Sequence, residues 1–159
     1  MNLRILTDAD IAALIPLLTN EQIKQTYMLP DFDRPEDAIP IARRLIRLSQ
    51  DKAHFVRGME ENGTLVGFLN DVEIADGIIE LGYAVHPDHW GQGFATSALR
   101  QAIGELFLLG YRKVTCGAFE ENPASLRVME KAGMQRLEKT DEIEYRCKRH
   151  RCVYYAIVR

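Results

Sequence analysis

The chain has 159 residues, of which 47% are apolar and 27% charged, and its formal net charge at pH 7 is −3. This length and apolar content are typical of one globular domain with a sizeable core, and they exclude disordered and fibrous classes. The balance of charge gives no basic footprint for nucleic acid, and no run of about 18 apolar residues predicts a membrane helix. We therefore expect a single domain over residues 1–159, with neither nucleic acid nor a membrane as partner.

The N-terminus and the cysteines favour a cytoplasmic location. Asp8 and Asp10 interrupt the basic-then-apolar layout that a signal peptide requires. The three cysteines are an odd number in a chain that is large enough to fold without disulfides, so we expect reduced thiols. The segment "CKRHRC" (147–152) offers only two cysteines and one histidine, which favours a hairpin turn over a zinc site with four protein ligands. We expect no metal.

The first fifty residues predict one strand and two helices. The segment "NLRIL" (2–6) is typical of a short strand. Thr7 is expected to cap a helix that runs to about Thr19. Asp33, with Glu36 three positions later in capping-box spacing, is expected to start a second helix that ends near residue 50.

Three apolar or alternating segments follow, at residues 53–59, 64–74 and 77–86. The short turn signals "ENGT" and "ADG" separate them. Parallel neighbours need a long crossover, so these short connections predict an antiparallel meander.

The second half of the chain alternates helices and strands. A helix is expected over 94–109, a strand over 113–119 and a helix over 123–133, with Asn122 as its N-cap. The tail 142–159 predicts two strands around a basic turn.

The order of elements is therefore βαα-βββ-α-β-α-ββ. The strand–helix–strand unit across 77–119 predicts a parallel pair with a right-handed connection. The fold class is α+β: a central twisted, mixed but mostly antiparallel sheet of about seven strands, flanked by about four helices.

A glycine pair lies where a strand gives way to a helix, in "ELGYAVHPDHWGQGFATSALRQA" (80–102). Gly91 and Gly93 could simply supply a turn with positive φ. A phosphate-binding P-loop is excluded because no Lys-Ser/Thr pair follows. A dinucleotide fingerprint fails because Thr96 stands at its third glycine and because a meander precedes it. The remaining reading is a pyrophosphate loop, in which backbone N–H groups and the positive end of the helix receive the anion.

The segment "ELGYAVHPDHWGQGFATSAL" resembles the acyl-CoA-binding segment of the GNAT superfamily of N-acetyltransferases, and is closest to the ribosomal-protein N-terminal acetyltransferase branch. The superfamily pattern falls on residues 90–95, with Trp90 in place of a polar first residue. Downstream, "NPASLRVMEKAGM" (122–134) resembles a second motif of that branch, with Lys131 in place and Met134 where Phe is usual. The order of elements agrees over nearly the whole chain, although residues 1–50 agree only in pattern.

The resemblance implies a three-layer fold that transfers an acetyl group from acetyl-CoA to an amine by direct attack. The pantetheine arm would lie between the strand 78–85 and its parallel neighbour, with the main chain of Val85 contacting the thioester. The residues expected to bind the cofactor are Val85, Gln92, Gly93, Phe94, Ala95, Thr96, Ser97 and Asn122.

An amine acceptor is protonated at neutral pH, so the reaction needs a base or a proton-conducting path of water. The resemblance makes Glu80 the first candidate. Asp71 and Glu73, on the preceding strand, are the next. Strand alternation puts Glu80 on one face of its strand with Gly82 and Ala84, and Leu81, Tyr83 and Val85 on the other. The alternative is a polar residue on a solvated strand face.

A proton donor would help the thiolate to leave. Many superfamily members use a Tyr at the position of Met129, whereas the ribosomal branch has a Ser at the position of Ser125. The alternative is that Ser125 only completes the start of its helix beside Asn122.

Two other functions remain open, a non-catalytic acyl-CoA sensor and a dinucleotide-dependent oxidoreductase. The acceptor is also open: a protein N-terminus, a polyamine, an amino acid or a drug-like amine. Residues 20–50 and the tail are expected to line its side, where Tyr27 and Phe32 are either pocket walls or core. A homodimer is compatible with the sequence, which leaves the oligomeric state open.

Overall fold

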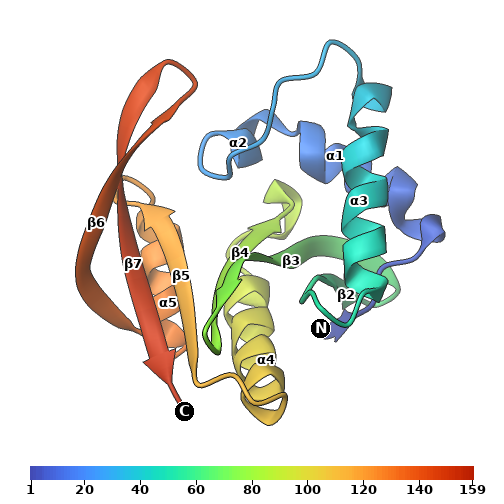
Figure 1. Ribbon diagram of the computed structural model, residues 1–159. Helices are drawn as coiled ribbons and strands as arrows, with labels where there is room; N and C mark the ends of the chain where they lie inside the picture. The colour runs from blue at the N-terminus through green and yellow to red at the C-terminus, as the bar shows by residue number, and fades with distance from the viewer.

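One sheet of seven strands organises the molecule (Figure 1). The computed structural model describes all 159 residues. The strands are β1 (Asn2–Arg4), β2 (Arg57–Glu61), β3 (Thr64–Ala75), β4 (Ile78–Val85), β5 (Lys113–Phe119), β6 (Gln135–Tyr145) and β7 (Lys148–Val158). Their order is β1-β2-β3-β4-β5-β7-β6, and every neighbouring pair is antiparallel except β4 and β5. The predicted α+β class with a mixed, mostly antiparallel sheet is confirmed.

Five α-helices pack on this sheet: α1 (Ile11–Thr19), α2 (Glu21–Lys24), α3 (Ile39–Gln50), α4 (Phe94–Leu108) and α5 (Pro123–Lys131). Three single turns of 3₁₀-helix precede α1, α3 and α4: η1 (Asp8–Asp10), η2 (Pro35–Ala38) and η3 (Pro87–His89). The sequence predicts four of the helices and misses α2, which has only one turn. No helix is both long enough and apolar enough to cross a membrane.

Two separate cores give the molecule three layers. A cluster of 20 buried residues joins α4 and α5 to one face of the sheet, through side chains such as Leu99, Met129 and Leu81. A cluster of 13 joins α1 and α3 to the other face, through Leu14 and Phe68 for example. Strand β4 contributes to both clusters, so it lies in the middle of the molecule with helices on either side.

The predicted meander and crossover are both present. The β2–β3 turn has φ of 50° at Asn62 and 79° at Gly63, and the β3–β4 turn has 53° at Asp76 and 73° at Gly77. Two consecutive positive φ values are the signature of a type I′ turn, which suits the twist of a two-residue hairpin. Helix α4 then carries the chain from β4 to the parallel β5.

Two strand boundaries differ from the prediction. Strand β2 begins at Arg57 rather than at residue 53, because Asp51 first closes a turn by accepting the N–H of Ala53 (2.9 Å). Strand β6 begins at Gln135, seven residues before the predicted start at 142. It is an edge strand with most side chains exposed, so it lacks the apolar alternation that would reveal it.

The predicted start of one helix is wrong, and that of another is confirmed. Arg34, not Asp33, is the N-cap of η2, the turn that leads into α3. The capping-box partner is Asp37, which accepts the N–H of Arg34 (3.2 Å), and not Glu36. Thr7 does take the N-cap position before η1 and α1, where its N–H donates to Asp10 (2.8 Å).

Candidate active site

The parallel strands β4 and β5 pair over only four residues each. Their pairing runs from Ile78 opposite Lys113 to Leu81 opposite Cys116. Beyond that point, β4 continues beside β3 and β5 continues beside β7 (Figure 1). We call the unpaired stretch between Gly82–Val85 and Gly117–Phe119 the fork. Backbone groups of β4 that face the fork have no strand to bond with.

Val85 presents its N–H to the fork. The N–H of His86 donates to the carbonyl of Val66 in β3 (2.8 Å), and in a strand successive N–H groups point to opposite sides. The N–H of Val85 therefore points away from β3. Its carbonyl accepts a hydrogen bond from the indole Nε1 of Trp90 (2.7 Å). Trp90, which departs from the superfamily pattern, thus ties the glycine loop to the end of β4.

The glycine loop leaves the first turn of α4 open. Gly91 and Gly93 have φ of 75° and 81°, and a Cβ on either would meet nothing within 4 Å. Glycine is therefore needed here for its backbone conformation and not for lack of space. Gly93 is the N-cap of α4 and offers no side chain to cap it. The N–H groups of the first turn stay available to an anion at the positive end of the helix.

A cavity of about 370 Å³ adjoins this helix start, and no hydrophobic residue lines it. Its lining residues are Gly93, Thr96, Ser97, Arg100, Gln101 and Lys131. Three of them are predicted cofactor residues. Arg100 was not among the predicted cofactor residues, although its position one turn beyond Thr96 on the same helix is a signal for it. The Nε of Arg100 donates to the carbonyl of Lys131 (3.1 Å), which joins α4 to the end of α5 and brings two cations to this cavity.

The other predicted cofactor residues are placed differently. The amide of Gln92 donates to the carbonyl of Asp88 (3.3 Å). The side chains of Phe94 and Ala95 pack on the core, so these two residues can offer only backbone groups to a ligand. Asn122 accepts the N–H of Ser125 (3.3 Å) and is the N-cap of α5, as expected.

Glu80 lies on the α1/α3 side of the sheet, in a cavity of about 260 Å³ that Glu73, Lys139 and Tyr154 also line. Burial raises the pKa of the Glu80 carboxyl. Lys139 opposes this shift, whereas Glu73 and the neighbouring Asp141 raise the pKa further. A carboxylate whose charged form is destabilised is a better proton acceptor.

The two alternative carboxylates have different surroundings. Asp71 accepts the Phe55 N–H (3.0 Å), and its other oxygen lies 2.8 Å from Nδ1 of His54. Its carboxylate is therefore occupied in holding the segment before β2. Glu73 lies directly opposite Glu80 across the β3–β4 pair. The structure thus brings Glu73, but not Asp71, into the cavity of Glu80.

Ser125 is paired with Tyr83, which was not among the predicted site residues. The Oγ of Ser125 lies 2.7 Å from Oη of Tyr83, and Tyr83 also donates to the carbonyl of Ser125 (3.3 Å). The "GY" of the motif and the alternation along β4 together provide a signal, because they place Tyr83 on the face toward α5. Met129, at the position of the usual superfamily Tyr, is fully buried in the core.

The candidate base and the candidate hydroxyl donors therefore lie on opposite sides of the sheet. Glu80 belongs to the α1/α3 side, as the alternation predicts, and Tyr83 with Ser125 belongs to the α4/α5 side. The fork opens between the two sides. A reactive carbonyl held in the fork would have a proton acceptor on one side and hydroxyls on the other.

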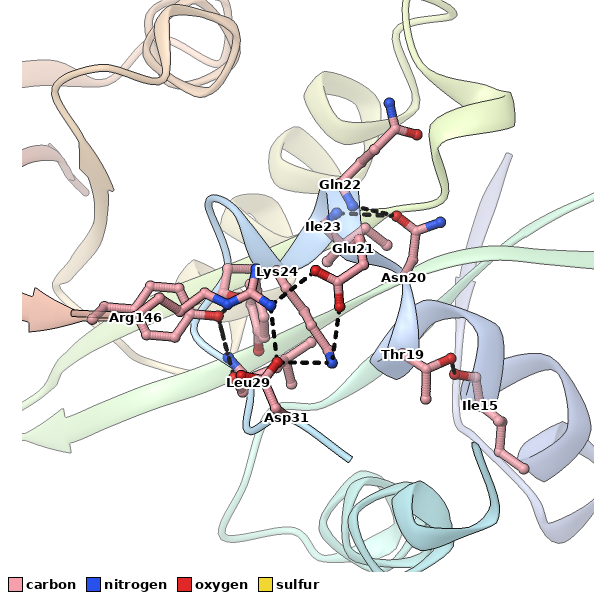
Figure 2. Close-up of polar contacts among 12 residues, drawn as sticks. Ile15, Thr19, Asn20, Glu21, Gln22, Ile23, Lys24, Leu29, Asp31 and Arg146 are labelled. Carbon is pink, nitrogen blue, oxygen red and sulfur yellow. Dashed lines mark hydrogen bonds and ion pairs between the residues drawn. The ribbon is translucent and has the colours of Figure 1, made fainter. Parts of the chain in front are cut away.

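Residues 20–31 contact the β6–β7 hairpin through ion pairs (Figure 2). Arg146, in the hairpin turn, pairs with Glu21 and Asp31, both at 2.9 Å. The buried Lys24 lies 3.3 Å from Asp31 and 3.5 Å from Glu21. Two cations and two carboxylates thus alternate across the contact, and we call these four residues the ion-pair bridge.

Tyr27 joins the same segment to β4. Its Oη donates to the side chain of Asn70 (2.7 Å), and its ring lies 3.5 Å from the place where a Cβ on Gly82 would stand. Both Tyr27 and Phe32 are partly buried and pack on the α1/α3 core. The prediction that residues 20–50 and the tail line the acceptor side stays a prediction; the structure shows only that residues 20–31 contact the hairpin of the tail.

The segment "CKRHRC" forms the predicted hairpin. Arg146 and Cys147 have φ of 52° and 59° and make the two-residue turn between β6 and β7. His150 is buried, stacks on Phe119 with ring centroids 4.3 Å apart, and lies 2.5 Å from Glu121.

A family model and a curated relative both identify this chain as similar to acetyltransferases. The family model described as an acetyltransferase (GNAT) domain matches residues 1–135. The uncharacterized N-acetyltransferase YoaA of Bacillus subtilis (strain 168) is 30% identical over 139 residues, which cover 84% of this chain and 78% of the relative.

Solved structures share the fold. Spermidine N-acetyltransferase from Vibrio cholerae, in complex with CoA and spermine, superposes with a TM-score of 0.83 at 20% identity, over 99% of this chain and 94% of the other. Ribosomal-protein-alanine N-acetyltransferase from Brucella melitensis superposes with a TM-score of 0.79 at 17% identity, over 99% of both chains.

Proposed function

Because the chain belongs to the GNAT acetyltransferase family, we propose that it transfers the acetyl group of acetyl-CoA to a primary amine by direct attack. The observation that carries the proposal is the fork beside the uncapped start of α4. A strand edge with free N–H groups suits an extended pantetheine arm, and an open helix start suits a pyrophosphate.

The donor would lie along the fork. The N–H of Val85 would donate to the thioester carbonyl and stabilise the negative charge that develops on its oxygen. The backbone of Gly93, Phe94 and Ala95, with the hydroxyls of Thr96 and Ser97, would hold the pyrophosphate. Arg100 and Lys131 line the adjoining cavity. Their positive charge would suit the 3′-phosphate of CoA.

The acceptor would come from the side of Glu80. In the proposed step Glu80 takes a proton from the ammonium, directly or through water, and the freed nitrogen attacks the thioester carbon. The C–N bond forms as the C–S bond breaks, and the electron pair of the C–S bond leaves on sulfur. The second proton of the attacking nitrogen passes to water as the amide forms. Ser125, on the opposite side of the fork, would donate a hydrogen bond to the leaving sulfur.

The proposed acceptor is a cation, because Glu80, Glu73 and Asp141 together outnumber the cations around this cavity. The Vibrio cholerae relative is a polyamine acetyltransferase and the Brucella melitensis relative acts on a ribosomal protein. Both amine classes belong in the test.

The test combines binding and turnover. Calorimetry with CoA and with NADH should show binding of CoA alone. Release of thiol from acetyl-CoA should then depend on one amine in a panel of polyamines, amino acids and peptides with free N-termini. Binding of CoA without turnover on any amine would instead favour the acyl-CoA sensor, and binding of NADH would favour the oxidoreductase.

A further inference from the structure

The hydroxyl of Tyr83 lies against two oxygen atoms of Ser125. Its oxygen lies 2.7 Å from Ser125 Oγ and 3.3 Å from the Ser125 carbonyl oxygen. The phenol has a single proton, and either hydroxyl can be the donor in the short contact between Oη and Oγ. We assign the phenol proton to Ser125 Oγ because that contact is much shorter than the one to the carbonyl, which is then a secondary acceptor. In this arrangement the proton of Ser125 Oγ is free to point elsewhere.

The surroundings leave this pair with few other partners. The N–H of Ser125 is already taken by the side chain of Asn122 (3.3 Å). The buried Cys116 thiol of β5 is the titratable group that acts on Tyr83 from the neighbouring strand. Burial raises the pKa of Tyr83, and burial also raises the pKa of Cys116, so both stay protonated through the neutral range. The phenol therefore keeps its proton and can donate it to Ser125 throughout this range.

We propose that Tyr83 is a positioning residue for thiolate departure: it donates to Ser125 Oγ, so that the Ser125 hydroxyl points into the fork and holds the leaving sulfur. This inference rests on the proposed function. No proton has to leave Tyr83 in the step. The electron pair of the C–S bond goes to sulfur, the Ser125 hydroxyl donates a hydrogen bond to the thiolate, and the thiolate takes its proton from water after the amide has formed.

The reason for a second hydroxyl is the weakness of the first. A serine O–H is a poor acid, but hydrogen bonds in series polarise one another and strengthen each bond by about 10–30%. A hydroxyl that already accepts from a phenol is also held in one orientation. A thiolate hydrogen-bonded to such a hydroxyl is stabilised more than one facing a freely rotating serine.

The decisive measurement is the thiol pKa of bound CoA, followed by the ultraviolet absorbance of the thiolate as pH rises. We expect the wild-type protein to lower this pKa by about one pH unit relative to free CoA. Tyr83→Phe, which keeps the ring and removes the hydroxyl, should reverse a substantial part of the shift. Ser125→Ala should abolish it, and Tyr83→Phe should have no further effect in the Ser125→Ala background.

Kinetics provide a second readout. Tyr83→Phe should lower kcat about tenfold and Ser125→Ala about a hundredfold, with both KM values nearly unchanged. Tyr111→Phe is the matched control, because Tyr111 is also partly buried against the α4/α5 core and its hydroxyl makes no hydrogen bond. That variant should match the wild type in both measurements.

The outcomes separate this inference from the proposed function. If CoA binds and acetyl transfer proceeds, but Tyr83→Phe leaves the thiol titration unchanged, the role of Tyr83 is wrong and the proposed function stands. An effect of Tyr83→Phe that persists undiminished in the Ser125→Ala background also overturns it, because the two hydroxyls then do not act in series. If CoA does not bind the wild-type protein, the proposed function fails and this inference fails with it.

Discussion

Glu80 is partly buried beside two carboxylates, and its burial and these neighbours raise the pKa of its carboxyl. In the proposed role it works as a base only when ionised, so kcat/KM of the wild type should rise with pH through this raised pKa. Glu80→Gln should lower kcat about a hundredfold near neutral pH. The loss should shrink at high pH, where the acceptor loses its proton to solvent.

The same pKa shift has a consequence for stability. The folded protein holds the Glu80 proton at pH values where the unfolded chain has released it, so stability falls as pH rises from the unfolded pKa to the folded one. Above the folded pKa, Glu80→Gln should therefore raise the melting temperature.

Glu73→Gln, across the strand pair, is the control for the prediction on turnover. A loss of kcat as large as that of Glu80→Gln would assign the role of base to Glu73.

Gly93 and Gly104 are a matched pair of glycines in α4 and its cap. Both have open space where a Cβ would stand, but only Gly93 has a positive φ, of 81°. Gly93→Ala should destabilise the fold by roughly 1–2 kcal/mol and weaken CoA binding, because the loop would have to change its backbone. Gly104→Ala should stabilise by about 0.5–1 kcal/mol and leave binding unchanged. Calorimetry and thermal melts of both variants decide this, and equal CoA affinities would argue against a pyrophosphate at the loop.

At the scale of elements, the ion-pair bridge connects α2 and the following loop to the β6–β7 hairpin (Figure 2). Arg146→Gln should loosen this side of the site and raise KM for the amine about twofold to fivefold, with KM for acetyl-CoA unchanged. Added salt should raise the amine KM of the wild type more than that of the variant, since exposed ion pairs are screened.

Arg149→Gln is the control, because Arg149 is exposed on the same hairpin and takes part in no ion pair. A rise in the amine KM of equal size in both variants would mean that hairpin charge in general, and not the ion-pair bridge, affects the acceptor.

The elements that the sequence predicts well are those in which periodicity and punctuation agree. The meander has alternating strands and Asn-Gly or Asp-Gly turns, and α5 has both Asn122 and Pro123 at its start. The elements that it misses lack one of these signals. Strand β6 has too few buried positions to show a period, and α2 has only one turn, whose place depends on contacts with a hairpin more than 100 residues away.

The site follows the same division. The glycine loop could be predicted because the positive φ values that it requires are met by two glycines close together in the sequence. The pairing of Tyr83 with Ser125, and of Arg100 with Lys131, depends on how helices α4 and α5 pack on the sheet and on each other. These contacts join residues at least 31 positions apart, and no local pattern encodes them.

At the scale of the whole molecule, the fork divides the sheet into two parts joined by only four residue pairs between β4 and β5. The β1–β4 part carries Glu80 and the β5–β7 part leads to Ser125 in α5. A pantetheine arm along the fork would bond to strand edges that have no partner, and the pyrophosphate would bind at α4, which connects the two parts. Ligand binding should therefore stabilise the fold as a unit.

CoA at about 100 times its dissociation constant should add about 2.7 kcal/mol to the free energy of unfolding. For a domain of this size the melting temperature should then rise by roughly 5–10 °C, measured by thermal melts with increasing CoA. NADH at the same concentration should give no shift. Gly93→Ala should need more CoA for an equal shift, because mass action depends on the dissociation constant. A melting temperature that does not respond to CoA would mean that the fork and the glycine loop do not receive this ligand.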